Sequence, residues 1–313
     1  MRIATGPLSR CLSILIYHRV IAEPDPLLPG LVCASDFDWH LAVLGRWFKP
    51  LALPDAIARL HSGTLPARAA CVTFDDGYED NVTVALPILR RHGIPATFFV
   101  ATGFLNSGRM WNDTIIDTVR LARGGALDAR RIGLDVLPIS TLQERRAAVG
   151  RLISALKYLP LDERLEHAET LRARAEVELG DGLMMTRDQL RALRGHGMEV
   201  GAHTVNHPIL AKLHEEAAFA EIRNSKTELE AVTGSPVRLF AYPNGKPGRD
   251  YRSEHVDMVR RLGFAGAVST AMGVGIRSSD CYQLPRFTPW DRTPTRFLLR
   301  LLRNTFRTSA LRV

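Results

Sequence analysis

The sequence predicts an α/β fold. Short apolar runs end in polar or turn residues and are followed by helical patterns, which is the order expected of parallel strands joined by helices. The chain has 313 residues, of which 46% are hydrophobic and 24% charged, so it can bury a large core. No stretch reaches the roughly 18 consecutive apolar residues that a membrane span needs.

Six apolar runs are candidate strands. They are Leu12–Tyr17, Ala70–Phe74, Ala96–Val100, Glu199–Ala202, Leu239–Ala241 and Ala265–Val268. Two of the segments that join them are predicted helices. One is Asn81–His92, which ends at Gly93, and the other is the longer His214–Val232, which ends before Gly234 and Pro236. The alternation of strands and helices favours a parallel sheet.

The N-terminal apolar run, residues 11–17, superficially resembles a signal peptide but is too short for one. It stops at His18-Arg19 with no small-residue cleavage site behind it, so we assign it to a buried strand. We therefore expect the protein in the cytoplasm or at the cytoplasmic face of the inner membrane. The four cysteines lie far apart without a CxxC pair, and we expect buried thiols in a reducing compartment.

The alternation of predicted strands and helices stops at residues 105–185. We predict that this segment is a helical insertion within a single catalytic domain, residues 1–313. Strand signals are few there, and leucines recur at near-helical spacing: Leu152, Leu156, Leu159, Leu165 and Leu171. Such a stripe is typical of a packing subdomain, while a lid or a partner-binding segment remains an alternative. Trp111, next to Asn112 and Asp113, is a candidate sugar contact or, alternatively, a core residue.

The strongest local signal is the run Cys71-Val72-Thr73-Phe74-Asp75-Asp76-Gly77-Tyr78. An apolar strand here delivers two adjacent carboxylates to its C-terminal end, where parallel α/β proteins build their sites. Adjacent carboxylates repel each other, and a nearby cation keeps both ionised. A bare Asp-Asp pair is also common in helix caps and loops, so Asp75 and Asp76 need partners to define a site.

The partners follow a second strand, Glu199–Ala202, which runs into His203 and His207. Imidazole nitrogens together with carboxylate oxygens suit zinc and similar first-row divalent ions. Pro208 disfavours a helical conformation at His207, so we place both histidines on a loop at the strand end. Either histidine alone would be read as structural, but with the acidic pair they predict a metal site.

Together, Thr73-Phe74-Asp75-Asp76-Gly77 and His203-Thr204-Val205-Asn206-His207 resemble the TFDDG and H-[ST]-x-x-H motifs of the NodB-type polysaccharide deacetylases, the fourth carbohydrate esterase family. The resemblance implies a distorted (β/α)7 barrel. It also implies that Asp76, His203 and His207 bind a divalent metal, Zn²⁺ in first place, with Co²⁺, Ni²⁺ or Mn²⁺ as alternatives. Asp75 is then the general base.

A third family motif, a Pro-aromatic-Gly turn lining the substrate groove, is matched in part by Tyr242-Pro243-Asn244-Gly245. Asn244 stands where an aromatic residue is usual. A main-chain N–H at this place can still stabilise an oxyanion, because the donor does not depend on the side chain. An ordinary Pro-Asn-Gly turn explains the same residues.

The usual C-terminal Leu-x-Leu-His motif of the family is absent, and the corresponding stretch reads Leu284-Pro285-Arg286-Phe287. A branch of the family that deacetylates poly-N-acetylglucosamine looks circularly permuted, with its acid histidine on an N-terminal strand ending Tyr-His, as Leu15-Ile16-Tyr17-His18 does here. The resemblance predicts His18 as the general acid. We expect Arg286 to orient Asp75 and lower its pKa, with a purely structural ion pair as the alternative.

These assignments predict a metal-dependent hydrolase that removes N-acetyl groups from N-acetylglucosamine-type sugars of a polysaccharide or exopolysaccharide precursor and releases acetate. The same machinery acting on another N-acyl group, such as a formamido sugar on a lipid carrier or a small amide, is an alternative. So is a barrel that binds carbohydrate without catalysis, although the intact acidic and histidine residues argue against it.

The net charge of +8 first suggests a nucleic-acid partner, but its distribution argues against one. Six of these eight charges fall in residues 292–313, which contain six arginines and no acid, and the remaining chain carries +2. Apolar residues alternate with the arginines, which predicts a basic amphipathic helix. Such a helix either packs on the barrel or lies on an anionic membrane surface.

Overall fold

The structure is a computed structural model that describes residues 10–308 and 310–313. The chain divides into two compact units. Unit 1 contains the chain up to Glu23, Val32–Asn106 and the chain from Met185 on, and unit 2 contains Pro24–Leu31 and Ser107–Met184. Unit 2 thus combines most of the predicted insertion, residues 105–185, with a short earlier segment.

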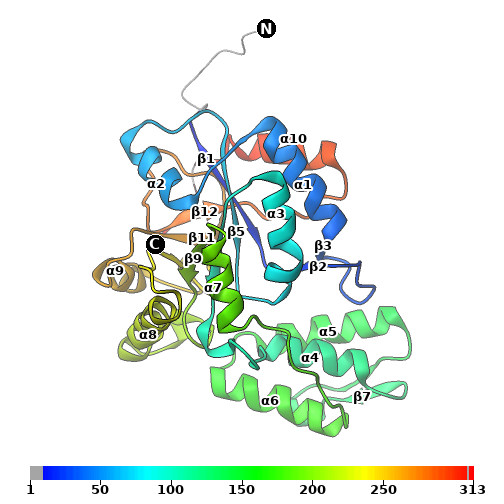
Figure 1. Ribbon diagram of the computed structural model, residues 1–313. Helices are drawn as coiled ribbons and strands as arrows, with labels where there is room; N and C mark the ends of the chain where they lie inside the picture. Colours follow the sequence, from blue (N-terminus) through cyan, green and yellow to red (C-terminus); the bar gives the residue numbers. More distant parts are fainter. Residues whose placement is uncertain (1–9, 309) are drawn as a thin grey trace. The chain divides into compact units, whose positions relative to one another are not determined.

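Unit 1 is built around a parallel sheet whose strands lie in the centre of a ring of helices (Figure 1). In spatial order the strands are β1 (Leu12–Tyr17), β5 (Ala69–Phe74), β6 (Ala96–Val100), β9 (Glu199–Ala202), β10 (Leu239–Ala241), β11 (Gly266–Met272) and β12 (Leu284–Arg286). The sheet closes on itself after β12, because the Phe287 N–H donates to the Ile14 carbonyl (2.7 Å) and the Ile16 N–H to the Phe287 carbonyl (3.1 Å). The predicted (β/α)7 barrel is therefore confirmed.

All six predicted strands are present, and β12 was missed. Proline lacks the N–H that a strand needs, and a charged residue seldom lies inside a barrel, so Leu284-Pro285-Arg286 did not read as a strand. Short pairs were missed as well: β4 (Lys49–Pro50) pairs with the first residues of β5, and β2 (Val20–Ile21) pairs with β3 (Val32–Cys33).

The helices of unit 1 surround the sheet. They are α1 (Ala34–Trp47), α2 (Leu53–Ser62), α3 (Leu86–His92), α7 (Arg187–Gly195), α8 (Glu215–Thr233), α9 (Ser253–Arg261) and α10 (Pro294–Asn304). The predicted helix from Asn81 begins as a π-helical turn, Asn81–Ala85, and continues as α3 to Gly93, which has the left-handed φ of 63° that favours glycine.

Unit 2 is mainly helical, as predicted. It contains α4 (Trp111–Leu121), α5 (Leu142–Leu156) and α6 (Leu161–Arg174), together with a short antiparallel hairpin of β7 (Ala126–Asp128) and β8 (Val136–Pro138) that the sequence did not reveal. Three leucines of the predicted stripe, Leu152, Leu156 and Leu171, are buried in the unit's own hydrophobic core, whereas Leu165 is largely exposed.

Two further sequence predictions concern thiols and the membrane. No cysteine of the described residues is in a disulfide; Cys11, Cys33 and Cys71 are buried, while Cys281 is half-buried. Among the helices of residues 10–308 and 310–313, none is both long and apolar enough to cross a membrane.

Candidate active site

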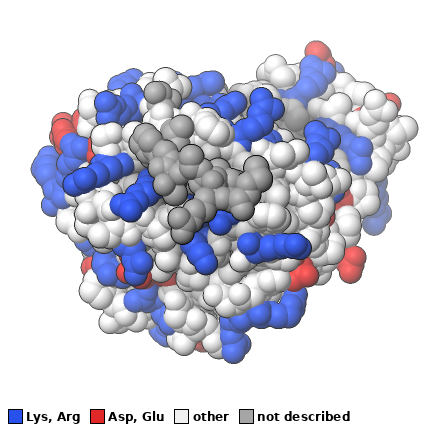
Figure 2. Space-filling view, turned by 90° about the horizontal axis from the view of Figure 1, so that it is seen from above, with Lys and Arg blue, Asp and Glu red and all other residues white. Residues whose placement is uncertain are grey.

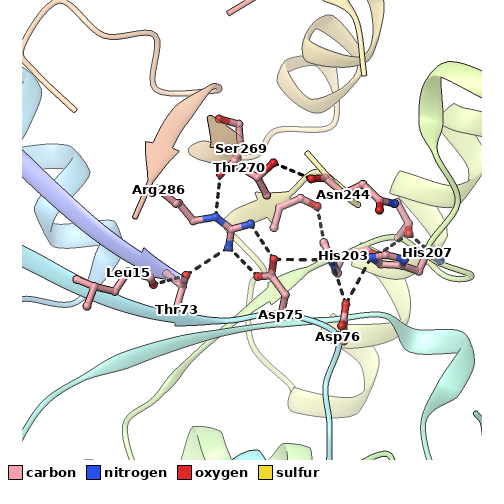
Figure 3. Close-up of polar contacts among 12 residues, drawn as sticks. Leu15, Thr73, Asp75, Asp76, His203, His207, Asn244, Ser269, Thr270 and Arg286 are labelled. Carbon is pink, nitrogen blue, oxygen red and sulfur yellow. Dashed lines mark hydrogen bonds and ion pairs between the residues drawn. The ribbon is translucent and has the colours of Figure 1, made fainter. Parts of the chain in front are cut away.

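The barrel gathers the predicted site residues at the C-terminal ends of its strands. Asp75 and Asp76 follow β5, and His203 follows β9, with β6 between these two strands. The ladder continues past the strand ends, because the Asp75 N–H donates to the Tyr17 carbonyl (2.9 Å) and the His203 N–H to the Val100 carbonyl (3.2 Å). The four side chains of Asp75, Asp76, His203 and His207 consequently point toward one another (Figure 3).

Asp76, His203 and His207 form a cluster with the geometry of a metal site. One ligand atom from each lies within 4.8 Å of the others, and the Nε2 atoms of both histidines are 3.4 Å from Asp76 Oδ1. Asp76 Oδ1 is buried and accepts no hydrogen bond in the structure. His203 Nδ1 donates to the Ala241 carbonyl (2.7 Å), which leaves Nε2 with its lone pair facing the cluster. A buried, unsatisfied oxygen between two imidazole nitrogens fits a first-row divalent cation.

The Asp76 carboxylate is aimed by a strained turn. Its φ of 77° is left-handed, and the Gly77 N–H donates to the Asp75 carbonyl (3.0 Å) to close a three-residue γ-turn around Asp76. Gly77 itself has a φ of 93°, and a Cβ there would lie 2.9 Å from Val100 Cγ1. Strain of this kind persists where the surrounding structure enforces it, which is common at functional sites.

The second histidine lies on a loop, as Pro208 led us to expect. Both Thr204 and His207 have positive φ, 65° and 50°, and the His207 N–H donates to Thr204 Oγ1 (3.1 Å). Glu221 of α8 secures this loop, because its Oε2 accepts from the N–H groups of Val205 and Asn206, each at 2.9 Å. No sequence motif marks Glu221, and only its contacts identify it as a residue that positions His207.

Asp75 stands beside the cluster and is held by Arg286, which is fully buried. The two terminal nitrogens of Arg286 each donate to one carboxylate oxygen of Asp75 at 2.7 Å, and its Nε donates to the Ser269 carbonyl at 2.9 Å (Figure 3). Thr73 adds a longer contact to Arg286 at 3.3 Å. Asp75 Oδ2 lies 4.0 Å from His203 Nε2, so this carboxylate faces the cluster without being one of its three closest members.

Charges decide how these buried groups ionise. Burial disfavours the charged form of Asp75, but the Arg286 and His203 charges outweigh it and lower the pKa of Asp75. Burial opposes ionisation of Asp76 too, and the contacts from both histidines nevertheless hold its pKa well below the usual range. Burial lowers the pKa of His207 to about 3, so its imidazole is neutral at pH 7 and offers a lone pair.

His18, the predicted acid, follows β1 and is exposed. His18 is among the smaller causes that lower the pKa values of both Asp75 and Asp76. The role of His18 as the general acid stays a prediction.

The loop that carries His18 is fixed by residues the sequence did not reveal. Asn81 Nδ2 donates to the His18 carbonyl at 2.8 Å. The buried Asp80 accepts from Arg19 Nε (2.7 Å) and from the Val20 N–H (3.1 Å). Asp80 and Asn81 lie a few residues after the Asp-Asp-Gly run, so the same turn that aims Asp76 leads directly into the contacts that hold His18.

The turn after β10 has the predicted tight shape. Asn244 has a φ of 59°, and the Gly245 N–H donates to the Pro243 carbonyl at 2.6 Å. Thr270 anchors the turn, since its Oγ1 donates to the Asn244 carbonyl (2.7 Å) and its N–H to the Gly245 carbonyl (2.9 Å). Within Tyr242–Gly245 only Asn244 is partly exposed.

The assignment of Tyr242 as a substrate contact needs correction. Its side chain is fully buried, its ring stacks on Tyr251 with centroids 3.9 Å apart, and its hydroxyl donates to the Tyr282 carbonyl at 3.0 Å. These contacts give Tyr242 a packing role beneath the turn. The aromatic ring followed by proline supported the prediction, but the sequence does not show which way the ring points.

Trp111 belongs to unit 2 and is not among the residues gathered in unit 1. It begins α4, is half-buried, and its ring lies 5.4 Å from the guanidinium carbon of the buried Arg164. It also lines a cavity of about 430 Å³ within unit 2, together with Arg109 and Glu169. The ring is therefore both a packing element and part of a polar cavity wall.

A closed parallel barrel with an Asp-His-His cluster and an ion-paired second aspartate defines a class of barrel hydrolases. The model of the family described as "Polysaccharide deacetylase" matches residues 62–267, and the chain belongs to this family. The matched region contains Asp75, Asp76, His203 and His207, whereas His18 and Arg286 lie outside it.

Several relatives support the same fold. The chain is 20% identical over 277 residues to Bacillus subtilis (strain 168) YxkH, whose name places it among the polysaccharide deacetylases; the match covers 88% of this chain and 70% of YxkH. Among solved structures, Streptococcus pyogenes deacetylase PplD in complex with acetate superimposes with a TM-score of 0.64 at 20% identity, covering 93% of this chain and 97% of PplD. IcaB from Ammonifex degensii gives 0.61 at 18% identity, covering 95% and 97%.

Proposed function

We propose that this polysaccharide deacetylase family member is a metal-dependent hydrolase that removes N-acetyl groups from N-acetylglucosamine-type sugars of a polysaccharide or exopolysaccharide precursor. The observation that carries the proposal is the convergence of Asp76, His203 and His207 around a buried carboxylate oxygen without a hydrogen-bond donor. The adjacent aspartate, Asp75, is held in its ionised form by Arg286. The cytoplasmic location stays a prediction.

Asp76, His203 and His207 would hold the metal, for which Zn²⁺ is the first candidate and Co²⁺, Ni²⁺ or Mn²⁺ are alternatives. A divalent metal supplies Lewis-acid chemistry, polarising an amide carbonyl and making water more acidic. Asp75 and Asp76 raise the pKa of His203 against the effect of burial. Because a metal would take the neutral imidazole, we expect metal affinity to increase with pH.

The other side chains move protons. Asp75 accepts a proton from the water that attacks the acetyl carbon, and Arg286 keeps Asp75 ionised and fixed in orientation. His18 donates a proton to the sugar nitrogen as its bond to the acetyl carbon breaks. The oxygen of the water is then part of the released acetate, and the sugar keeps a free amine. One water is consumed for each acetyl group released. The main chain around Asn244 is the proposed source of further oxyanion stabilisation.

The proposal is tested by loading the purified protein with Zn²⁺ and measuring acetate release from N-acetylglucosamine oligomers. We expect Asp76→Asn to lose bound metal and activity, and Asp75→Asn to lose activity while keeping metal. His18→Ala should keep metal and lower kcat by about 10² to 10⁴. A folded, metal-loaded protein that releases no acyl group from any N-acylated sugar would refute the function, and normal turnover by His18→Ala would refute the role of His18.

A further inference from the structure

The last part of the chain has an unusual surface, which we call the C-terminal arm and define as residues 290–313. Across the described residues, the four most exposed large hydrophobic side chains all belong to it: Trp290 (56%), Leu299 (56%), Phe306 (69%) and Leu311 (76%). The opposite side of α10 is buried through Phe297 and Leu301. The arm is thus anchored to unit 1 by one apolar face and leaves further apolar side chains in contact with water.

Positive charge surrounds these apolar side chains. Arg292, Arg296, Arg303, Arg307 and Arg312 are exposed, and the sequence from 292 to 313 contains no acid. In the part of the chain that the structure describes, Arg296 and Arg303 have no acidic partner. On α10, Arg296 lies three residues before Leu299 and Arg303 four residues after it, so both are next to Leu299 on the helix surface. Two other arginines of the arm do have acidic partners, Arg300 with Asp291 (2.8 Å) and Arg292 with Asp36 (3.4 Å). Part of the positive charge of the arm is therefore used in ion pairs, and the charges of Arg296 and Arg303 are not.

The arm also forms a cavity of about 620 Å³ with a basic and aromatic lining. Three arginines (Arg300, Arg303, Arg307) and three aromatic rings (Phe287, Trp290, Phe306) line it, and no carboxylate does. The guanidinium carbon of Arg300 lies 3.8 Å from the Trp290 ring centroid and 4.2 Å from that of Phe287, so Arg300 fixes Trp290 beside the helix. Among the charged side chains on the face seen in Figure 2, basic ones cover more of the surface than acidic ones.

We propose that the C-terminal arm docks the protein peripherally on an anionic phospholipid surface. Exposed aromatic and leucine side chains beside unpaired arginines match the boundary between acyl chains and negatively charged headgroups. A nucleic acid would use the arginines and stack on the aromatic rings, but it would leave Leu299 and Leu311 exposed to water. The proposal goes beyond the proposed function and does not depend on it.

The test is co-sedimentation of the full-length protein with vesicles of pure phosphatidylcholine and with vesicles that also contain phosphatidylglycerol. We expect binding to the phosphatidylglycerol vesicles only, weakened by added salt. Leu299→Glu/Phe306→Glu should reduce binding by about tenfold or more, because it removes two inserting side chains and adds two like charges. The matched control, Leu121→Glu/Leu165→Glu, makes the same change at two exposed leucines of unit 2 and should bind as the parent protein does.

A second variant, Arg296→Gln/Arg303→Gln, keeps the apolar side chains and removes only two charges without internal partners, so it tests the charge even if the glutamate variant folds poorly. It should bind phosphatidylglycerol vesicles more weakly. The proposal is overturned if the parent protein does not bind these vesicles, if it binds both vesicle types equally, or if the arm variants bind as the control does. Thermal unfolding and acetate release of each variant report on the fold and on catalysis separately from docking.

Discussion

Replacing Arg286 by methionine tests the buried ion pair that the proposed reaction requires. The change leaves the Asp75 carboxylate without its two 2.7 Å hydrogen bonds, in a place where both side chains are at most 3% exposed. Removing one partner of a buried pair costs about 3–5 kcal/mol, because the remaining charge is neither solvated nor paired. That is a large fraction of the 5–15 kcal/mol that typically separates folded from unfolded protein.

A double-mutant cycle separates this explanation from simple loss of packing. In Arg286→Met/Asp75→Asn no charge is left unpaired, so we expect most of the lost stability to return even though the double variant is inactive. Free energies of unfolding from urea titrations provide the measurement. The reasoning is refuted if the double variant is as unstable as Arg286→Met alone.

The control pair is Arg194 and Glu199, which also make a 2.8 Å contact but are more exposed. Arg194→Met should cost less than Arg286→Met, because the glutamate keeps a second cationic contact, to Arg238 at 3.5 Å. Arg286→Lys is the conservative variant: it keeps the charge but not the two-pronged contact, and it should recover part of the stability and part of the acetate release. Full activity in Arg286→Met would exclude a positioning role for Arg286.

Three further predictions follow from single contacts. Gly77→Ala places a Cβ 2.9 Å from Val100 Cγ1 at a φ of 93°, so we expect a loss of about 1–3 kcal/mol in urea titrations and lower Zn²⁺ occupancy; unchanged occupancy would contradict the strained-turn explanation. Glu221→Gln should weaken Zn²⁺ binding about 10- to 100-fold by loosening the loop that carries His207, measured against a chelating indicator, and equal affinity would remove Glu221 from the site. Burial lowers the pKa of His40 from 6.5 to about 4, so the unfolded chain takes up this proton first as the pH falls. Stability present above pH 6.5 is then lost toward pH 4, by about 2 kcal/mol between pH 7 and pH 5, and His40→Gln should abolish most of that difference.

The barrel was largely predictable because its strands are buried on both faces and read as continuous apolar runs between turn residues. What sequence reasoning missed was the strand β12, since Pro285 and Arg286 contradict strand propensity and Arg286 becomes acceptable in the core only through Asp75, 211 residues away. The short β7–β8 hairpin was not predicted for a different reason. Three-residue strands carry too little alternation to distinguish from a loop.

The cluster of Asp76, His203 and His207 was predictable because motif residues at two strand ends must meet at one edge of a parallel sheet. The contacts that hold it were not. Glu221 and Asn81 form hydrogen bonds with backbone groups of loops that are distant in the sequence. Such a contact needs only a side chain of suitable length with a donor or acceptor, so no sequence motif marks it. Tyr242 shows the converse case, in which a recognisable motif residue turned out to face the interior.

The composition of unit 2 has a consequence for anyone who would remove or transplant it. Pro24–Leu31 belongs to this unit although most of it lies some 80 residues later in the chain, and Leu27 is buried in the same core as α4, α5 and α6. Asp25 is paired with Arg120 at 2.6 Å, and the Pro26 carbonyl accepts from Arg146 Nε at 2.9 Å. If residues 107–184 alone were deleted, the apolar segment Pro24–Leu31 would lose the core in which it is buried. If residues 107–184 alone were expressed, that core would lack Leu27. The unit is a discontinuous module whose two pieces have to be inherited, exchanged or deleted together.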